Sequence, residues 1–420
     1  MLNSQISGIK SLFRPSEALK GPISVLTEAS SAYIPIAFSD EHYYTALSKG
    51  SSLSPQKQIS CTESGFPVYS AFSGNVEDIL NIKHPLINDI KAVKVSNPEF
   101  LFSIPAEKYD IDSYSPDEII EQAKLQGIVD ETDGERLYKK LQRIKAAGAK
   151  ILVCNALSDT PFEAANTALL RTYGEHISKA LVAASYAVGA SRCAIAVFDG
   201  KKAPQFPQSI GQVPVMKINF RYPSKPLLDM QIRGWGGGDQ IGVGALFALY
   251  QALTSHSPQT FVCLTVDGTA VKEPKNLFVP IGVTIGDVVR DCVLSDLPHL
   301  FVVGGIMNGV TCLPETPVTA TTSSIVVNDI ERYESEKVCS GCSECVGICP
   351  KKLLPVHIMT ALKRGNSKML SLLNPELCIG CGCCSYVCPS RINIMQSVLE
   401  AKDAVLSREV KKEDNGDEEL

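Results

Sequence analysis

The stretch CSGCSECVGICPKK, residues 339–352, contains four closely spaced cysteines, and a proline directly follows the last one. Nearly the same pattern returns as CIGCGCCSYVCPSR, residues 378–391. Each run reads C-x-x-C-x-x-C-x-x-x-C-P, which is the cysteine spacing of bacterial 4Fe-4S ferredoxins. Glycines such as Gly341, Gly380 and Gly382 suit a loop that wraps tightly around one cluster. The two runs therefore predict a C-terminal ferredoxin-like domain with two 4Fe-4S clusters.

The ligands of the two clusters are expected to cross between the runs. In paired modules of this kind the fourth cysteine of each run binds the cluster of the other run. We therefore assign Cys339, Cys342, Cys345 and Cys388 to the first cluster, and Cys378, Cys381, Cys384 and Cys349 to the second. Crossed ligation would hold the clusters close together, which favours an electron relay as the function.

Two structural zinc sites are the alternative interpretation of these cysteines. Zinc knuckles are usually built from two separated C-x-x-C pairs, and they require neither the third cysteine nor the trailing proline. The second run also contains a fifth cysteine, Cys383. Using it as a ligand would break the three-residue gap that precedes Cys388, so we interpret Cys383 as a bystander.

The composition is that of an ordinary globular protein, with 420 residues of which 45% are hydrophobic and 20% are charged. A chain of this length is expected to form two or three domains. Nine of the fifteen cysteines lie between Cys339 and Cys388, which indicates metal ligation in a reducing compartment rather than a disulfide framework. The net charge of −5, with no basic stripe, argues against a nucleic-acid partner.

The sequence also bears on location. The first thirty residues contain charges and prolines where a secretory signal would need an unbroken apolar segment. No apolar stretch reaches the roughly 18 residues that are needed to cross a bilayer. We therefore expect a cytoplasmic protein whose contact with a membrane, if it has any, is peripheral.

The predicted fold class is multidomain, with α+β and α/β parts. Short apolar runs broken by Gly, Pro and Ser indicate a β-rich module over residues 1–110. The remaining segments are predicted, in chain order, as an α/β core domain (111–258), a β-grasp-like unit (259–313), a linker (314–330), the ferredoxin-like domain (331–405) and a disordered acidic tail (406–420).

Helical and strand signals alternate in the α/β core. Ser115, Pro116 and Glu118 form the signature of a helix N-terminus with a capping box. The run KILVC, residues 150–154, predicts a buried strand, and a long helical pattern after it ends at Gly189. The glycine-rich GWGGGDQIG, residues 234–242, could cradle a phosphate, but it lacks the G-x-G-x-x-G spacing and is more often structural.

Most of the chain resembles the C subunit of Rnf-type electron-transport complexes. The resemblance is carried by PVYSAFSGNVEDI, by GDVV within residues 266–289, by VVGGIMNGV and by the two cysteine runs. It implies that the N-terminal module is barrel-sandwich-like and that the β-grasp unit is a soluble-ligand-binding (SLBB-like) unit. Among soluble relatives, the chain looks most like the proline-reductase-associated electron-transfer proteins of amino-acid-fermenting anaerobes. That likeness implies D-proline reductase as the acceptor and a donor that is associated with the membrane.

Members of this family that handle a nicotinamide or a flavin carry a glycine-rich loop where this chain reads GIVDETDGERLYKKL, residues 127–141. Asp130, Glu131 and Asp133 replace those glycines, and their charges are expected to repel a phosphate. The acidic N-G-A-E-x-E-P stretch of the family is also replaced here, by NALSDTP at residues 155–161. Both departures make FMN and NADH doubtful as cofactors.

Two functions of different classes follow from these observations. The first is an electron-transfer protein whose clusters are the only redox centres, and whose body serves for docking. The second is an oxidoreductase that binds NADH and a flavin in the body, as an Rnf-type C subunit or a cobalamin-reductase-like protein would. The loop at residues 127–141 distinguishes the two, and it favours the first.

Overall fold

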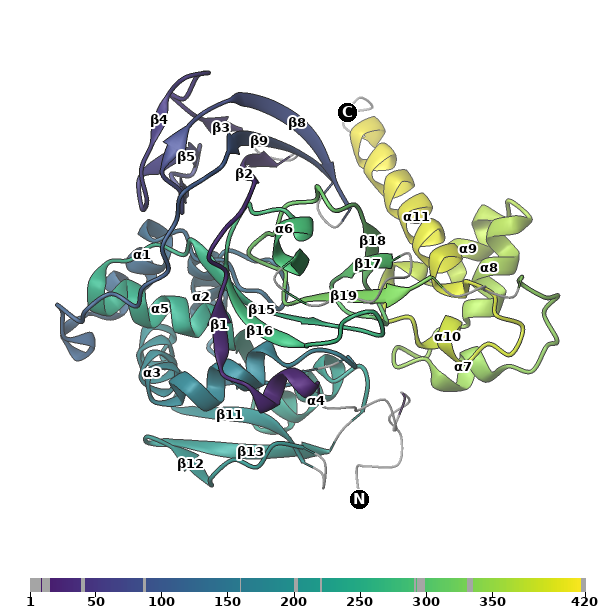
Figure 1. The fold of residues 1–420 in the computed structure, drawn as a ribbon. Helices are drawn as coiled ribbons and strands as arrows, with labels where there is room; N and C mark the ends of the chain where they lie inside the picture. Colours follow the sequence, from purple (N-terminus) through teal and green to yellow (C-terminus); the bar gives the residue numbers. More distant parts are fainter. Residues whose placement is uncertain are drawn as a thin grey trace. The chain divides into compact units, whose positions relative to one another are not determined.

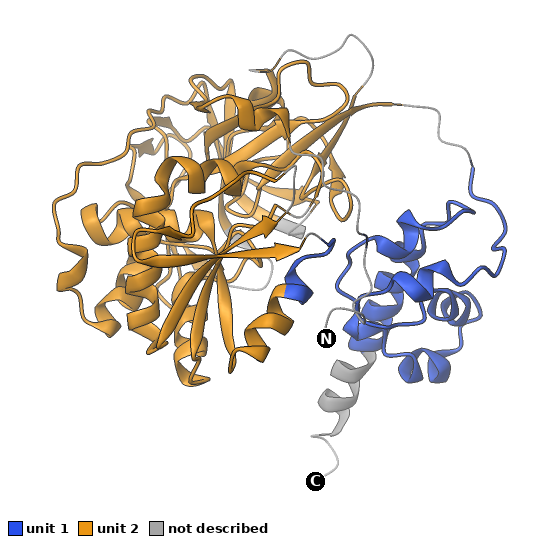
Figure 2. Ribbon diagram, turned by 90° about the horizontal axis from the view of Figure 1, so that it is seen from below, with its two compact units in different colours: residues 1–12, 221–227, 331–420 blue, residues 13–220, 228–330 orange. Residues whose placement is uncertain are grey.

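The computed structural model describes residues 9, 16–38, 42–85, 88–158, 160–199, 203–219, 221–290, 292, 299–330 and 335–416. The chain divides into two compact units, which are coloured separately in Figure 2. Unit 1 comprises residues 1–12, 221–227 and 331–420, and unit 2 comprises residues 13–220 and 228–330. Sheets and helices both occur in the chain (Figure 1), so the predicted mixed α/β class is confirmed.

The N-terminal part of unit 2 is built from small antiparallel sheets. The largest has the order β2-β9-β8, with β2 (Ser31–Phe38), β8 (Asp78–His84) and β9 (Asn88–Ser96). The others contain β3 (Tyr43–Tyr44), β5 (Gln58–Thr62) and β6 (Pro67–Tyr69), and β4 (Ser52–Leu53) with β7 (Gly74–Asn75). Alternate residues such as Ile34 and Ile36 are buried in one hydrophobic cluster, as the two-residue period of a strand requires.

The α/β part of unit 2 surrounds a five-stranded sheet of order β12-β13-β11-β10-β14. Its strands are β10 (Ile151–Asn155), β11 (Arg192–Asp199), β12 (Ser209–Ile210), β13 (Val213–Asn219) and β14 (Gly238–Gly242). The predicted strand β10 pairs in parallel with β11 and β14, and all five of its residues are buried. An unbroken apolar run is typical of such a central parallel strand.

Helices accompany this sheet, and their ends agree with the local sequence signals. They are η2 (Ile111–Ser113), α1 (Pro116–Leu125), α2 (Leu137–Ala146), α3 (Ala165–Val188), α4 (Lys225–Gly234) and α5 (Val243–Ser255). At the start of α1, the Ser115 side chain accepts from the amide of Glu118, and the Glu118 carboxylate accepts from the amide of Ser115. Helix α3 ends at Gly189, whose φ of +73° is left-handed.

The glycine-rich loop at residues 234–242 has a structural explanation. Gly236 and Gly237 have φ angles of +103° and +88°, which residues with a side chain rarely adopt. Gly238 lies so close to the backbone carbonyl of Ile151 that a Cβ atom would collide with it. The glycines therefore allow β14 to turn and lie directly against β10.

A six-stranded sheet in unit 2 has the order β1-β16-β15-β19-β17-β18. Its strands are β1 (Ile23–Val25), β15 (Phe261–Asp267), β16 (Lys275–Pro280), β17 (His299–Val303), β18 (Val310–Cys312) and β19 (Ser324–Asp329), and α6 (Ile285–Arg290) follows β16. Strand β1 from the N-terminal region pairs in parallel with β16. The sheet therefore extends beyond the predicted boundaries, 259–313, at both ends.

Strand β19 corrects the prediction of a linker at residues 314–330. It pairs in parallel with β15 and antiparallel with β17. Its residues Ile325, Val326 and Val327 are fully buried. The surrounding Thr and Ser residues gave this segment the composition of a connection, but the three β-branched residues in a row are typical of a buried strand.

Unit 1 contains the cysteine runs and a set of helices, most of them short. These are α7 (Glu344–Ile348), α8 (Pro355–Lys363), α9 (Ser367–Leu372), η3 (Pro375–Leu377), α10 (Cys383–Tyr386) and α11 (Ile394–Gly416). Ile358 of α8 and Val398 of α11 lie in the small core of this unit. Helix α11 continues through much of the predicted disordered tail, so that prediction fails for residues 406–416, and residues 417–420 lie outside the described residues.

In the part of the chain that the structure describes, every helix is too short or too polar to traverse a bilayer.

The capping box of α1 gives a test of the fold. Replacing Ser115 by Ala removes the side-chain acceptor for the Glu118 amide, which should cost about 1 kcal/mol of local helix stability. Amide hydrogen exchange in the first turn of α1 should then be about fivefold faster. Ser113→Ala is the matched control, because the Ser113 hydroxyl donates to the backbone oxygen of Asp110, which precedes η2, and not to α1. Unchanged exchange in Ser115→Ala would contradict the role of the cap.

Candidate metal centre

The two cysteine runs fold locally in the same way. In the first run, Gly341 and Ser343 are left-handed, with φ angles of +73° and +63°, and the short helix α7 follows. In the second run, Gly380 and Gly382 are left-handed, with φ angles of +62° and +73°, and α10 follows. A Cβ atom at Gly341 would meet nothing within 4 Å. The loops therefore need these residues for backbone conformation rather than for space.

The described residues of the two runs surround two separate hollows. The three leading cysteines of the first run line one hollow together with the last cysteine of the second run, and this set is Cys339, Cys342, Cys345 and Cys388. The three leading cysteines of the second run line the other hollow together with the last cysteine of the first run, and this set is Cys378, Cys381, Cys384 and Cys349. Each hollow is thus lined by one of the two predicted ligand sets.

The spacing of the donor atoms bears on which metal group fits. A tetrahedral zinc ion draws its thiolates to about 2.3 Å from one point. Among the residues that the structure describes, no three Cys, His, Asp or Glu side chains converge to hold a single ion. Four thiols around a hollow match a group that has its own volume, such as an iron–sulfur cube, so the residues present fit such clusters.

The cysteines differ in their surroundings. Cys339 and Cys342 are exposed, whereas Cys345 and Cys349 are buried. Burial raises the pKa of the Cys345, Cys349 and Cys378 thiols, and it raises that of Cys384 to about 12 with a further contribution from Cys381. Binding of a metal group would therefore have to displace protons from these thiols.

Backbone amides point at two of the predicted ligand sulfurs. The amide of Leu353 donates to Sγ of Cys349 at 3.4 Å, and the amide of Gly380 donates to Sγ of Cys378 at 3.4 Å. Hydrogen bonds to the sulfurs stabilise their negative charge and are among the factors that set cluster potentials. Both sulfurs belong to the set that surrounds the second hollow.

Cys383 also lines the second hollow, and its side chain is fully buried. Its thiol hydrogen-bonds to Cys381, and this bond is the main reason that the pKa of Cys381 falls to about 7. Its Sγ also lies 3.9 Å from the backbone oxygen of Tyr222. The hydroxyl of Tyr222 in turn donates to the backbone oxygen of Cys381 at 2.7 Å. Tyr222 was not predicted from the sequence, because no local pattern connects it to a cysteine run that lies far along the chain.

Two carboxylates of the acidic loop of unit 2, residues 127–141, form ion pairs within the chain, which the sequence did not predict. Lys140 donates to Asp130 at 2.7 Å and to Asp133 at 2.8 Å, and both Lys140 and Asp130 are fully buried. Two of the three carboxylates that were expected to repel a phosphate are therefore paired with one ammonium group. The Lys140 ammonium group therefore already has two carboxylate partners in this loop.

The third carboxylate, Glu131, lies at the N-terminus of α5. Its two oxygens accept from the amides of Gly244 at 2.7 Å and Ala245 at 2.9 Å. Asp130 accepts from the amide of Gly242 at 3.2 Å. Burial, followed by the neighbouring charge of Asp130, raises the pKa of Glu131 to about 7. The chain's own carboxylates thus occupy the helix N-terminus where a phosphate group would otherwise bind.

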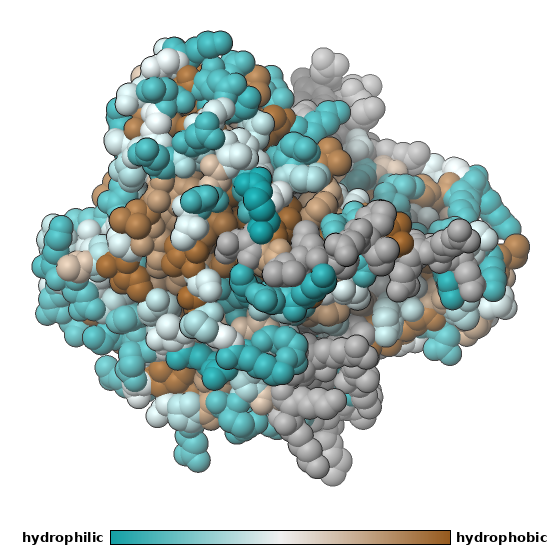
Figure 3. Space-filling view, viewed as in Figure 1, coloured by the Kyte–Doolittle hydropathy of each residue, from teal (hydrophilic) through white to brown (hydrophobic). Residues whose placement is uncertain are grey.

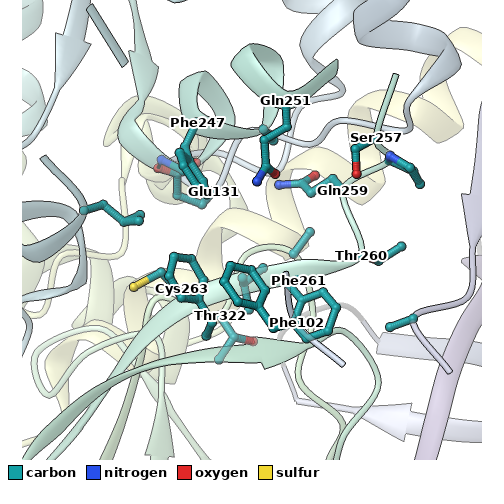
Figure 4. Close-up of a pocket in the computed structure, with 18 of the residues that line it drawn as sticks. Phe102, Glu131, Phe247, Gln251, Ser257, Gln259, Thr260, Phe261, Cys263 and Thr322 are labelled. Atoms are coloured by element: carbon teal, nitrogen blue, oxygen red, sulfur yellow. Dashed lines mark hydrogen bonds between the residues drawn. The ribbon is translucent and has the colours of Figure 1, made fainter. Parts of the chain in front are cut away.

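Glu131 also borders a cavity of about 80 Å³ within unit 2. Figure 4 shows the cavity between α5, which carries Phe247 and Gln251, and the strand that carries Phe261 and Cys263. In Figure 3, hydrophobic residues gather on the face of unit 2 in front of α1 and α5. The cavity thus combines aromatic walls with a few polar groups, as small-molecule sites do, but the amides at the α5 N-terminus are already bonded. The residues present do not fit a nucleotide phosphate at this end of α5.

Comparison with known proteins agrees with the C-terminal interpretation. Residues 338–392 match the family model of the 4Fe-4S dicluster domain. The prediction of an iron–sulfur, ferredoxin-like domain is thereby confirmed.

The chain is also similar to curated proteins that are named as the C subunit of an ion-translocating oxidoreductase complex. The protein of Haemophilus influenzae (strain 86-028NP) is 25% identical over 274 residues, which cover 59% of this chain and 41% of that protein. The protein of Vibrio cholerae (strain ATCC 39541) is 28% identical over 265 residues, covering 57% and 34%. The protein of Methanosarcina acetivorans is 36% identical over 129 residues, covering 30% and 28%. The matched region is thus less than half of each of these relatives.

Among solved structures, a chain of an NAD+-reducing NiFe hydrogenase in the H2-reduced state aligns with a TM-score of 0.47 and 16% identity, covering 72% of this chain and 67% of that chain. By sequence, the chain is similar to these C subunits over part of its length, and residues 338–392 match the 4Fe-4S dicluster domain.

Proposed function

We propose that this protein is an electron-transfer protein that relays single electrons through two 4Fe-4S clusters to a partner reductase. The observation that carries the proposal is the pair of hollows, one lined by the four cysteines of the first proposed ligand set and the other by the four of the second set together with Cys383. When bound, such clusters take up and release one electron at a time. The chain would contribute the thiolates, the amides of Leu353 and Gly380 that bond to sulfur, and the protein surface on which a partner docks.

The ligand assignment that we propose is the crossed one. Cys339, Cys342, Cys345 and Cys388 would hold the first cluster, and Cys378, Cys381, Cys384 and Cys349 would hold the second. The grouping of the cysteines around the two hollows supports this assignment. Cys383 remains outside the ligand set, because the four positions around the second cluster are then filled.

The identity of the partners is a further part of the proposal. The relatives named above belong to ion-translocating complexes, which supports a donor at the membrane and a peripheral association of this cytoplasmic protein. The acceptor that we propose is D-proline reductase, and this choice rests on the resemblance to the proline-reductase-associated electron-transfer proteins.

The domain organisation is proposed with two changes, at the predicted linker 314–330 and at residues 406–416, which continue helix α11. Residues 261–329 would form the β-grasp, SLBB-like unit, because the hairpin β15–β16, helix α6 and strand β19 beside β15 follow the β-grasp order. The antiparallel strands before it would form the barrel-sandwich-like module. The α/β core and the C-terminal ferredoxin-like domain keep the places that the sequence predicts.

A flavin- and NADH-dependent oxidoreductase is the second candidate. The cavity beside Phe247 and Phe261 favours it, since aromatic walls suit a planar ring. Against it stands the position of Glu131, whose carboxylate already bonds to the amides of Gly244 and Ala245. FMN and NADH therefore stay doubtful as cofactors of this chain.

The iron content tests the proposal as a whole. Two complete sites should give about eight irons and about eight acid-labile sulfides per chain after anaerobic reconstitution. Iron and sulfide analysis of the purified protein would measure both. About four irons would mean that one run binds no cluster, and zinc in place of iron would refute the assignment.

The crossed ligation can be tested with Cys349→Ser. Because Cys349 would complete the second cluster, the variant should lose or alter that cluster and keep the first one. Electron paramagnetic resonance with iron analysis would follow each cluster, with Cys383→Ala as the control that keeps the iron content unchanged. Loss of the site at Cys339, Cys342 and Cys345 instead would show that the ligands do not cross.

The choice between the two functions can be made with NADH. We expect no rapid reduction of the clusters by NADH alone, because a hydride carries two electrons and a flavin is needed to pass them on singly. Stopped-flow absorbance under argon would follow the cluster band, and reduction by a low-potential one-electron donor is the positive control. Rapid bleaching by NADH would reject the simple relay and support the oxidoreductase.

A further inference from the structure

Tyr222 and Cys383 form a small buried arrangement beside the second cysteine run. Tyr222 is 2% exposed and Cys383 is fully buried. Tyr222 belongs to unit 1 through the short segment 221–227, although neighbouring parts of the chain belong to unit 2. Its side chain reaches the backbone of Cys381, one of the proposed ligands of the second cluster.

The backbone of Tyr222 forms two hydrogen bonds with the backbone of Ile9. The amide of Ile9 donates to the oxygen of Tyr222 at 2.9 Å, and the amide of Tyr222 donates to the oxygen of Ile9 at 3.0 Å. The thiol of Cys383 lies against the same Tyr222 oxygen at 3.9 Å. Three chain segments, far apart in sequence, are therefore linked at the loop that carries Cys381.

The first run has a different environment at the matching positions. Cys342 corresponds to Cys381 in the repeated pattern, and Glu344 corresponds to Cys383. Cys342 and Glu344 are both exposed, whereas Cys381 is half-buried and Cys383 is buried. Two runs with the same cysteine spacing thus offer two different settings to their clusters.

We propose that Tyr222 and Cys383 are positioning residues that set the reduction potential of the second cluster and make it differ from the first. The proposal rests on the cluster assignment above. The hydroxyl dipole of Tyr222 points its positive end at the peptide of Cys381, and the Cys383 thiol, 3.9 Å from the backbone oxygen of Tyr222, helps to hold Tyr222 in place. The Tyr222 dipole favours the added negative charge of the reduced cluster and Cys383 supports Tyr222, so the loss of either side chain should lower the potential.

The consequence concerns the direction of the relay. The first site, with exposed Cys339 and Cys342, is open to exchange with a partner. The cysteines of the second site are half-buried or buried and, in this proposal, the site is tuned by Tyr222 and by Cys383, whose counterpart in the first run is the exposed Glu344. The two runs would then supply two redox centres with distinct tasks. The first would exchange electrons with a partner protein, and the second would hold the electron.

The test is the isosteric variant Tyr222→Phe, which removes the hydroxyl and keeps the ring that excludes water. We expect unchanged iron content, a more negative midpoint potential of the second cluster, and an unchanged potential of the first. Redox titration followed by electron paramagnetic resonance measures both potentials. Repeating the titration in a Cys342→Ser background, which lacks a ligand of the first site, assigns the signal that belongs to the second.

Two further variants make the result specific. Tyr386→Phe is the matched control, because Tyr386 lies in the same run on α10 but is 55% exposed, and it should shift neither potential. Cys383→Ala should shift the second potential in the same direction as Tyr222→Phe, with the iron content retained. Unchanged potentials in both Tyr222→Phe and Cys383→Ala, with full iron content, would overturn the inference and leave the relay intact. A wild-type chain that binds no iron would overturn the relay itself.

Discussion

A cube of iron and sulfur demands four thiolates at four corners, and a short C-x-x-C-x-x-C loop can reach only three of them. The fourth ligand must come from another part of the chain, and in unit 1 the last cysteine of each run lies beside the other run's hollow. Under the proposed assignment, this demand would hold the two runs together beside a small hydrophobic core. The clusters would serve as much of its interior, with Ile358 and Val398 packing nearby.

Unit 2 is organised by a different electrostatic requirement, at the start of α5. A helix N-terminus exposes amides that need acceptors, and here the acidic loop supplies them through Glu131 and Asp130. Asp130 is itself buried, and the ammonium of Lys140 compensates its charge. The acidic loop, the N-terminus of α5 and Lys140 are therefore connected by hydrogen bonds and ion pairs. Removing one of the charged side chains would leave a buried partner group unpaired.

Local features of the fold were predictable from the sequence, because the cause of each lies within a few residues. The capping box at Ser115, the buried strand at Ile151–Asn155 and the left-handed glycine at Gly189 are all of this kind. The pairing of β1 with β16 and the insertion of β19 beside β15 were not predictable, because strand partners are chosen by the whole sheet. The segment 314–330 in particular is polar, as a connecting loop usually is, but its residues 324–329 form a strand within the sheet.

The features of the candidate site can also be separated into those that the sequence predicts and those that it does not. Cysteine spacing identifies the type of cluster, since the ligand loop is local, but neither Tyr222 nor the pairing of Lys140 with two aspartates leaves a pattern in the sequence. The acidic residues of the 127–141 loop were expected to repel a phosphate by their charge, whereas in the structure Asp130 and Asp133 are paired with Lys140 and Glu131 is bonded to the amides of Gly244 and Ala245.

Occupation of a site excludes a ligand more strongly than repulsion does. Repulsion between exposed charges weakens with salt and with distance, whereas a phosphate that approached α5 would first have to displace Glu131 from two amides. The displaced carboxylate would remain in a buried setting beside Asp130, where burial already raises its pKa to about 7. An attached carboxylate also has no association entropy to lose, unlike a free ligand. Under the proposed function, the body is therefore complete without a nucleotide, and the redox chemistry is left to the cysteines of unit 1.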